Sequence, residues 1–187
     1  MKEDLLNTLY DYLLIFPKEK TRQTKLLNYL QNSTDEQVVD WNNFNGHIVA
    51  SGFIYAKKEK KFLLLYHKDS NMYLYPGGHI NSDDINVLEA AKREIFEETG
   101  LKNIEQLKLS KNELLPLDID IHLISYNKRL NLPEHYHFDF RYLFMVDKIP
   151  KIKIDVKEHA NYKWVDLNDL SKNENYGTIV TKIKKLL

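Results

Sequence analysis

Three glutamates, Glu94, Glu97 and Glu98, have the spacing i, i+3 and i+4, which places their carboxylates on one side of a helix. Carboxylates gathered in this way can bind one hard cation such as Mg²⁺ or Mn²⁺, which prefers oxygen ligands. A solvated acidic helix face is the plainer interpretation of the same pattern. The flanking residues favour the metal site, because Arg93 adjoins the acids and Gly100 can end the helix.

The segment around these acids resembles the signature of the Nudix hydrolases. Its second half, from Arg93 to Leu101, fits that signature without exception. The first half departs from it, because fourteen residues separate Gly78 from Arg93 where the family has thirteen, and Asp84 stands in place of a glutamate. We interpret this as a one-residue insertion in the turn before the helix. The insertion leaves the metal cluster intact and leaves open whether Asp84 pairs with the arginine.

The resemblance implies roles for the residues of this signature. Glu97 and Glu98 would bind Mg²⁺ or Mn²⁺, and Glu94 would be the third ligand or the general base. The carbonyl of Gly78 would complete the metal site, since a glycine lets the backbone approach closely. Arg93 would orient a glutamate, with an ordinary surface ion pair as the alternative.

Many members of the family carry a further acid on a late loop, and Glu158 occupies a comparable place. It would be an extra metal ligand or base, with a solvated loop glutamate as the alternative. The activity implied is metal-dependent cleavage of a diphosphate bond in a nucleoside diphosphate linked to another moiety, with a substrate resembling ADP-ribose. Pro116 stands where many ADP-ribose pyrophosphatases of the family have a proline, with an ordinary turn proline as the alternative. Hydrolysis of NTPs or other nucleotides is the alternative. A nucleotide-binding regulatory module is a non-enzymatic alternative, which the intact glutamates disfavour.

Histidines form a second set of candidate site residues. His79, His122, His135 and His137 stand in Pro-Gly-Gly-His, Asp-x-His and His-x-His-x-Asp segments. These segments, with Gly46-His47, resemble those of a bacterial Nudix subgroup. Residues two apart in a strand share a face, so we predict that the four histidines line one wall of the cleft beside the glutamate helix and bind substrate phosphates. Strand capping is an equal alternative, and a second transition-metal site ranks below both.

Composition limits the partners and the compartment. Lysine plus arginine and aspartate plus glutamate number 27 each, so no net field draws the chain to nucleic acid or to an anionic membrane. The chain has no cysteine, which excludes disulfides and thiolate metal sites. No stretch approaches the length of a membrane span. We expect a cytoplasmic protein that binds a small nucleotide, without nucleic-acid or membrane partners.

The periodicity of apolar residues changes near residue 45. Helical spacing predicts an N-terminal helical extension over residues 1–44, which we interpret as packing onto the core, with a cap or a homodimer contact as alternatives. Residues 45–187 form the expected Nudix domain, of α/β (α+β) class, an α/β/α sandwich with a mixed sheet. Ser33 and Glu36 could open a short third helix as a capping box. The other expected elements are strands 48–56, 62–66, 114–125, 138–146 and 162–165 and helices 84–98 and 176–187.

Overall fold

The computed structural model describes residues 1–126, 128, 131–173 and 176–187. Over these residues, eight strands form one mixed sheet in the order β3-β2-β1-β7-β5, with β4 paired to β1, β6 to β7 and β8 to β2. The strands are β1 (His47–Ala56), β2 (Lys61–His67), β3 (Met72–Leu74), β4 (Gly77–His79), β5 (Glu105–Gln106), β6 (Asp118–Ile124), β7 (His135–Val146) and β8 (His159–Asp166).

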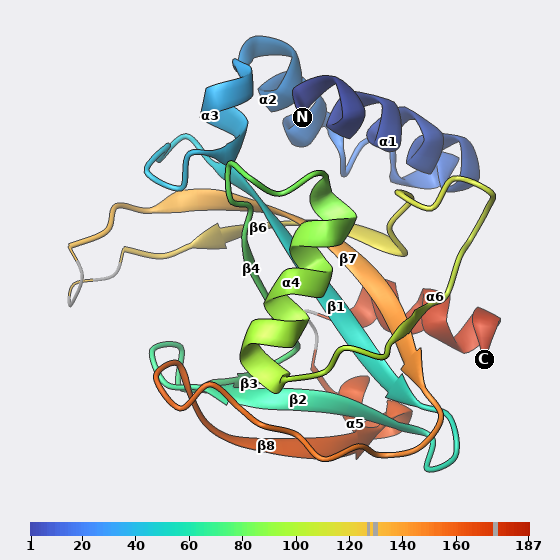
Figure 1. The fold of residues 1–187 in the computed structure, drawn as a ribbon. Helices are drawn as coiled ribbons and strands as arrows, with labels where there is room; N and C mark the ends of the chain where they lie inside the picture. Colours follow the sequence, from blue (N-terminus) through green and yellow to red (C-terminus); the bar gives the residue numbers. More distant parts are fainter. Residues whose placement is uncertain (127, 129–130, 174–175) are drawn as a thin grey trace.

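Helices cover both faces of this sheet. Figure 1 shows α4 in front of β1 and α6 behind β7, while α1, α2 and α3 cross one end of the molecule. The predicted α+β sandwich with a mixed sheet is therefore confirmed. The helices are α1 (Lys2–Ile15), η1 (Pro17–Glu19, a 3₁₀ turn), α2 (Thr24–Asn32), α3 (Asp35–Val39), α4 (Val87–Thr99), α5 (Leu167–Leu170) and α6 (Gly177–Leu186).

Alternation along β1 divides the core into two layers. Ala50 and Ile54 belong to a buried cluster that includes Ile95 of α4. Phe53 points to the opposite face, where it packs in a second cluster with Ile179 of α6. Because successive strand residues face opposite ways, even-numbered residues of β1 face α4 and odd-numbered residues face away from it.

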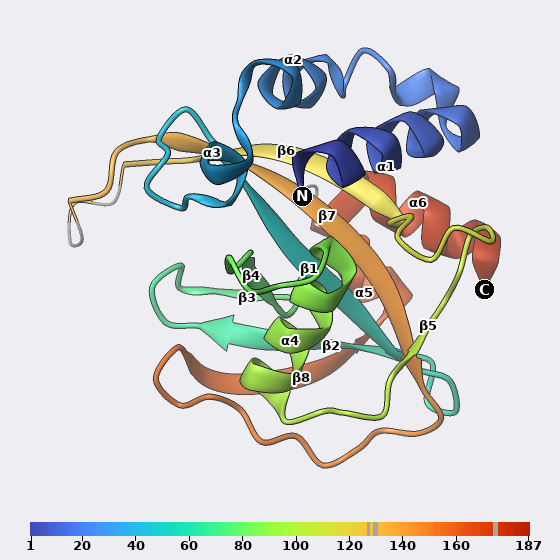
Figure 2. The ribbon, with the colours of Figure 1, turned by 45° about the horizontal axis from the view of Figure 1, so that its top comes forward.

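The N-terminal helices share one buried cluster with α4, and Figure 2 shows α1 and α2 running alongside β6. Leu9 and Leu30 are completely buried in the same cluster as Ile95. Tyr29 stacks on Phe138 of β7 with ring centroids 4.7 Å apart. These contacts support the interpretation of the extension as packing onto the core, and the boundary at residue 44 stays a prediction.

Several predicted boundaries were wrong for local reasons. Helix α4 begins at Val87 rather than at residue 84, because the Asn86 side chain accepts the backbone N–H of Glu89 and caps the helix. The capping box of α3 is formed by Thr34 and Gln37, one residue beyond the predicted pair. Strands β3, β4 and β5 and helix α5 were not predicted, because two to four residues are too few to show a period.

A buried ion network joins the N-terminal segment to the edge strand β6. Asp118 is completely buried, and it accepts hydrogen bonds of 2.8 Å from both Arg22 and Lys182. Arg141 of β7 lies 3.5 Å from its other oxygen. Although burial acts in the opposite direction, Lys182, Arg22 and Arg141 hold the pKa of Asp118 below its ordinary value. One carboxylate thus links the segment before α2, the sheet and α6.

We expect Asp118→Asn to destabilise the protein by about 3–5 kcal/mol, because three cations would lose their buried anion. Urea unfolding followed by circular dichroism would measure the loss. Asp169→Asn is the matched control, since it makes the same change of carboxylate to amide in an exposed ion pair with Lys172. Its unfolding midpoint should stay near that of the wild type. Equal midpoints for the two variants would contradict the structural role of the network.

Candidate active site

Strand β4 brings the chain's backbone against the carboxylates of α4. Gly78 pairs with Ala50 of β1, and a Cβ atom at Gly78 would lie 2.7 Å from the carboxyl carbon of Glu94. The backbone N–H of Gly77 donates to Oε2 of Glu98 over 3.2 Å. Only glycine permits so close an approach, so the Gly-Gly pair places backbone polar groups directly beside two of the predicted ligands.

Arg93 uses its guanidinium to organise the acids. Its Nε and Nη2 donate to the two oxygens of Asp84 over 2.9 and 2.8 Å. Its Nη1 donates to Glu94 over 2.8 Å and to Glu97 over 3.1 Å. Nη2 also donates to the carbonyl of His79 over 2.8 Å. Asp84 therefore does pair with the arginine despite the inserted residue, and it does so as a bidentate partner.

The three signature glutamates differ in exposure. Glu98 is 5% exposed, and burial, followed by the charge of Glu94, raises its pKa to about 9. Burial also raises the pKa of Glu94, against the hydrogen bond from Arg93. Glu97 is half exposed at the open side of the helix. Glu98 and Glu94 are therefore withdrawn from water, and the neighbouring cations do not fully offset their charge.

Glu158 joins this group from the loop before β8. One oxygen of Glu158, one of Glu98 and a ring nitrogen of His159 lie within 4.8 Å of one another. The Nε2 atom of His159 is 3.8 Å from Glu98, and burial lowers the pKa of His159 to about 4. A neutral imidazole does not neutralise a carboxylate, so a divalent cation bound by these oxygens fits the donor set and the charge of the site.

The histidines of the sequence segments gather into one cluster that also includes His47. The ring of His47 lies 4.9 Å from that of His79, 5.0 Å from that of His135 and 4.7 Å from that of His137. The ring of His122 is 5.5 Å from that of His137. The predicted common face of the four histidines is therefore confirmed. Burial, followed by the neighbouring rings, lowers the pKa of His137 to about 2 and that of His47 to about 4.

The expectation that this cluster shares a wall with the glutamates was wrong. His79 pairs with Val49, an odd-numbered residue of β1, whereas Gly78 pairs with Ala50. Ala50 lies on the face covered by α4, so the ring of His79 projects from the other face. His137 pairs with His47 and follows the same parity. The backbone of β4 thus separates the imidazoles from the carboxylates.

Sequence reasoning missed the parts that His47 and His159 take in these two groups. Both side chains are almost completely buried, at 1% and 2% exposed. A signal existed for each of them, since His47 follows Gly46 in a segment already compared with the subgroup and His159 directly follows Glu158. Their membership depends on which strands become neighbours, and a single sequence does not show that.

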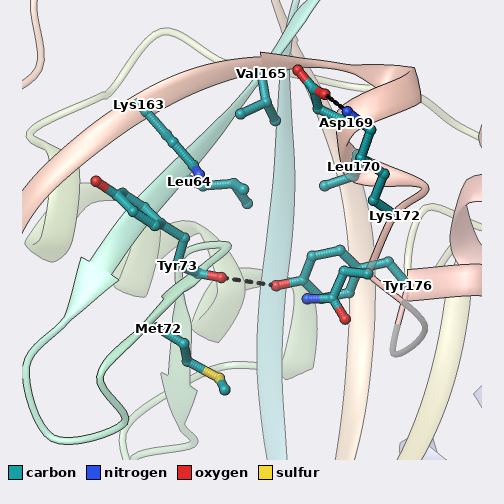
Figure 3. A pocket seen from close by; sticks show the side chains of 10 residues that line it. Leu64, Met72, Tyr73, Lys163, Val165, Asp169, Leu170, Lys172 and Tyr176 are labelled. Carbon is teal, nitrogen blue, oxygen red and sulfur yellow. Dashed lines mark hydrogen bonds and ion pairs between the residues drawn. The ribbon is translucent and has the colours of Figure 1, made fainter.

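A separate pocket of about 600 Å³ lies between β3, β8 and the C-terminal helices (Figure 3). The hydroxyl of Tyr176 donates to the carbonyl of Tyr73 across it over 3.2 Å. Lys163 lies over the ring of Tyr73 at 3.9 Å from the centroid. No residue of α4 lines this pocket. The pocket is therefore separate from the carboxylate site.

Comparison with known proteins agrees with this geometry. The model of the NUDIX domain matches residues 46–183, which is most of the chain. The protein therefore belongs to the Nudix family and is a Nudix hydrolase. The bacterial subgroup suggested by the histidine segments stays a prediction.

Named relatives place the chain among pyrophosphohydrolases. A probable DHNTP pyrophosphohydrolase of Lactococcus lactis is 28% identical over 148 residues, which cover 79% of this chain and 81% of the relative. An RNA pyrophosphohydrolase of Bartonella henselae is 28% identical, with 67% of this chain and 73% of the relative covered. An Ap4A hydrolase of C. elegans has the same fold, with a TM-score of 0.58 and 20% identity over 74% of this chain and 96% of its own.

Among the described residues, no helix has the length and apolar character needed to cross a membrane.

We expect the metal-free protein to become less stable as pH rises, because of the titration of Glu98. The folded pKa of about 9 exceeds the ordinary 4.5, so between these values the folded chain keeps a proton that the unfolded chain has released, and the free energy of unfolding decreases as pH rises. Glu98→Gln removes this titration. Its melting temperature in EDTA should therefore exceed that of the wild type by an amount that grows from pH 5 to pH 9, at about 2–4 °C for each kcal/mol.

Thermal melts at several pH values would test this expectation. Glu89→Gln, on the same helix but in an exposed pair with Lys92, is the control and should follow the wild type throughout. A gap between Glu98→Gln and the wild type that is independent of pH would contradict the assignment of the titrating group.

Proposed function

We propose that this Nudix hydrolase cleaves a diphosphate bond in a nucleoside diphosphate linked to another moiety, with Mg²⁺ or Mn²⁺ as cofactor. Glu94, Glu97, Glu98 and the carbonyl of Gly78 would hold the cation. The observation that carries the proposal is the convergence of the buried Glu98 and the half-buried Glu94 on the backbone of β4, where Gly78 approaches Glu94 and Gly77 donates to Glu98. A cluster built only for stability would not leave Glu98 buried with a pKa of about 9.

A bound divalent cation offsets the charge of the diphosphate oxygens and lowers the pKa of a bound water. The chain's own groups then position the reactants and accept the proton. Arg93 holds Glu94 and Glu97 in orientation through Nη1. Glu158 or Glu94 would accept the proton of the attacking water. We favour Glu158 as the base, because one oxygen of Glu94 already accepts a hydrogen bond from Arg93.

The substrate class is supported by comparison and by the chemistry of the site. A NUDIX domain of Shewanella oneidensis NrtR that is complexed with ADP ribose has this fold, with a TM-score of 0.53 and 15% identity. The fold of an Ap4A hydrolase is also shared. ADP ribose and Ap4A, the molecules named in these descriptions, are nucleotides in which phosphates join two groups. Such a molecule would present its phosphate bridge to the carboxylate-held cation, and this supports the ADP-ribose-like assignment.

Hydrolysis of a nucleoside triphosphate is the second candidate. It is favoured by the name of the Lactococcus lactis relative, a DHNTP pyrophosphohydrolase, at 28% identity. A purely nucleotide-binding regulatory role is disfavoured by the chain itself, because every acid of the second half of the signature is present and Arg93 keeps its partner Asp84. A substrate panel of ADP-ribose, NADH, sugar nucleotides, dinucleoside polyphosphates and NTPs would decide between the two enzymatic candidates.

Replacing either Glu97 or Glu98 by glutamine should lower kcat on the best substrate of the panel by several orders of magnitude, because each change removes a metal-binding charge. Steady-state kinetics with Mg²⁺ in excess would measure the loss. Glu89→Gln is the matched control on the same helix and should keep near wild-type kcat. Turnover close to that of the wild type in both test variants would end the proposal.

Removal of the metal gives an independent test. A chelator should abolish turnover, and Mg²⁺ or Mn²⁺ should restore it, because the site offers oxygen ligands that suit hard cations. The same addition should not restore Glu98→Gln. Full activity in a chelator, or recovery with Zn²⁺ and not with Mg²⁺ or Mn²⁺, would contradict the choice of cofactor.

A further inference from the structure

We propose that His47, His79 and His137 form a second metal site, which binds Zn²⁺ or a similar divalent transition ion on the sheet face opposite α4. One ring nitrogen from each of the three lies within 4.8 Å of the other two. The proposal goes beyond the hydrolase site, because it uses none of the signature glutamates.

The backbone register brings the three rings together from three adjacent strands. His137 of β7 is the direct partner of His47 in the parallel ladder with β1. His79 of β4 pairs with Val49, two residues along β1 from His47 and on the same face. The ring centroids of His79 and His137 are 5.5 Å apart. Hydrogen-bonded sheet thus holds all three Cα positions, which favours a preorganised site.

The hydrogen bond of the His47 ring leaves the lone pair of its other nitrogen without a partner. Its side chain is buried, at 1% exposed. The Nδ1 atom lies 3.4 Å from the carbonyl of Asn43, and since a carbonyl only accepts, Nδ1 carries the proton. Nε2 then holds the lone pair, and it is buried without a hydrogen-bond partner among the described residues. Buried polar atoms rarely stay unpaired, whereas a metal-binding histidine commonly donates its other N–H to a carbonyl in this way.

The donor set selects the kind of ion. Imidazole nitrogen suits Zn²⁺ and other later transition ions, while Mg²⁺ prefers oxygen. Three histidines and an open fourth position are a known arrangement for zinc, with water or a substrate atom as the fourth ligand. His79 is exposed, so the fourth position can be reached from solvent. The two proposed sites would therefore differ in their ions as well as in their sheet faces.

His135 acts as a positioning residue and not as a ligand. Its Nδ1 atom donates to the carbonyl of Pro133 over 2.7 Å, and its Nε2 lies 3.2 Å from Nε2 of His137. Because Nδ1 of His135 carries its proton, its Nε2 accepts from the Nε2–H of His137, and His137 would bind the ion through Nδ1. Phe44 packs edge-on against its ring at a centroid distance of 5.8 Å. His135 would hold the ring of His137 in orientation.

The test is zinc binding by the full chain without an affinity tag. The protein would be stripped with a chelator and dialysed against Zn²⁺ with Mg²⁺ in excess, and its metal content measured by mass spectrometry. We expect one tightly held Zn²⁺ per chain. His79→Ala removes an exposed ligand without opening the core and should lose that ion. Replacing His135 by alanine should weaken binding by about 10–100-fold, the usual effect of losing a partner of a metal ligand.

Two controls separate this site from the hydrolase site. His67→Ala removes a histidine outside the cluster and should keep the ion. Glu98→Gln should also keep it, even where turnover is lost, so failure of one proposal leaves the other standing. Co²⁺ in place of Zn²⁺ should give the visible absorption of a nitrogen-bound ion, which His79→Ala abolishes. No retained Zn²⁺, or equal retention by wild type and His79→Ala, would overturn the proposal.

Discussion

The pairing of β1 with β4 and β7 is the constraint on which both clusters depend. In this ladder Gly78 stands opposite Ala50, and His79 stands opposite Val49. Because side chains alternate across a strand, two adjacent residues of β4 serve two faces of the sheet. One face receives the carboxylates of α4 against a bare glycine backbone, and the other receives the imidazole rings. A shift of one residue would bury a ring where Glu94 now lies.

The negative charge of the neighbouring carboxylates explains why Arg93 makes so many hydrogen bonds. Burying several carboxylates is unfavourable unless hydrogen bonds or cations compensate for lost water. Arg93 contributes a fixed fork that bonds Asp84, Glu94 and Glu97 together, but it makes no bond to Glu98. The site consequently keeps one buried acid with a raised pKa. A buried acid without a compensating cation is what the proposed metal-dependent hydrolysis requires at this position.

Much of the fold and of the carboxylate site was predictable from the sequence, because the signals are local. The glutamate spacing, Gly100 and the alternation of His135 and His137 each lie within a few residues, and each prediction of helix end or shared face was confirmed. Strand β4 was not predictable, since Gly77–His79 has no apolar period and no β-branched residue. The face of His79 depends on its pairing partner, and the role of Asp84 depends on how a loop closes. Both are settled by long-range contacts.

The N-terminal segment shows the same limit on a larger scale. The family match begins at residue 46, yet the core that supports α4 continues into Leu9 and Leu30. The ion network at Asp118 also crosses this boundary, because Arg22 precedes it and Lys182 lies near the chain's end. Apolar contacts alone are not directional and would leave the position of the N-terminal helices loosely defined. The hydrogen bonds of Asp118 are directional and specify one position of these helices on the sheet. The segment is therefore part of the structure that fixes β6 and β7, the strands that carry His122, His135 and His137.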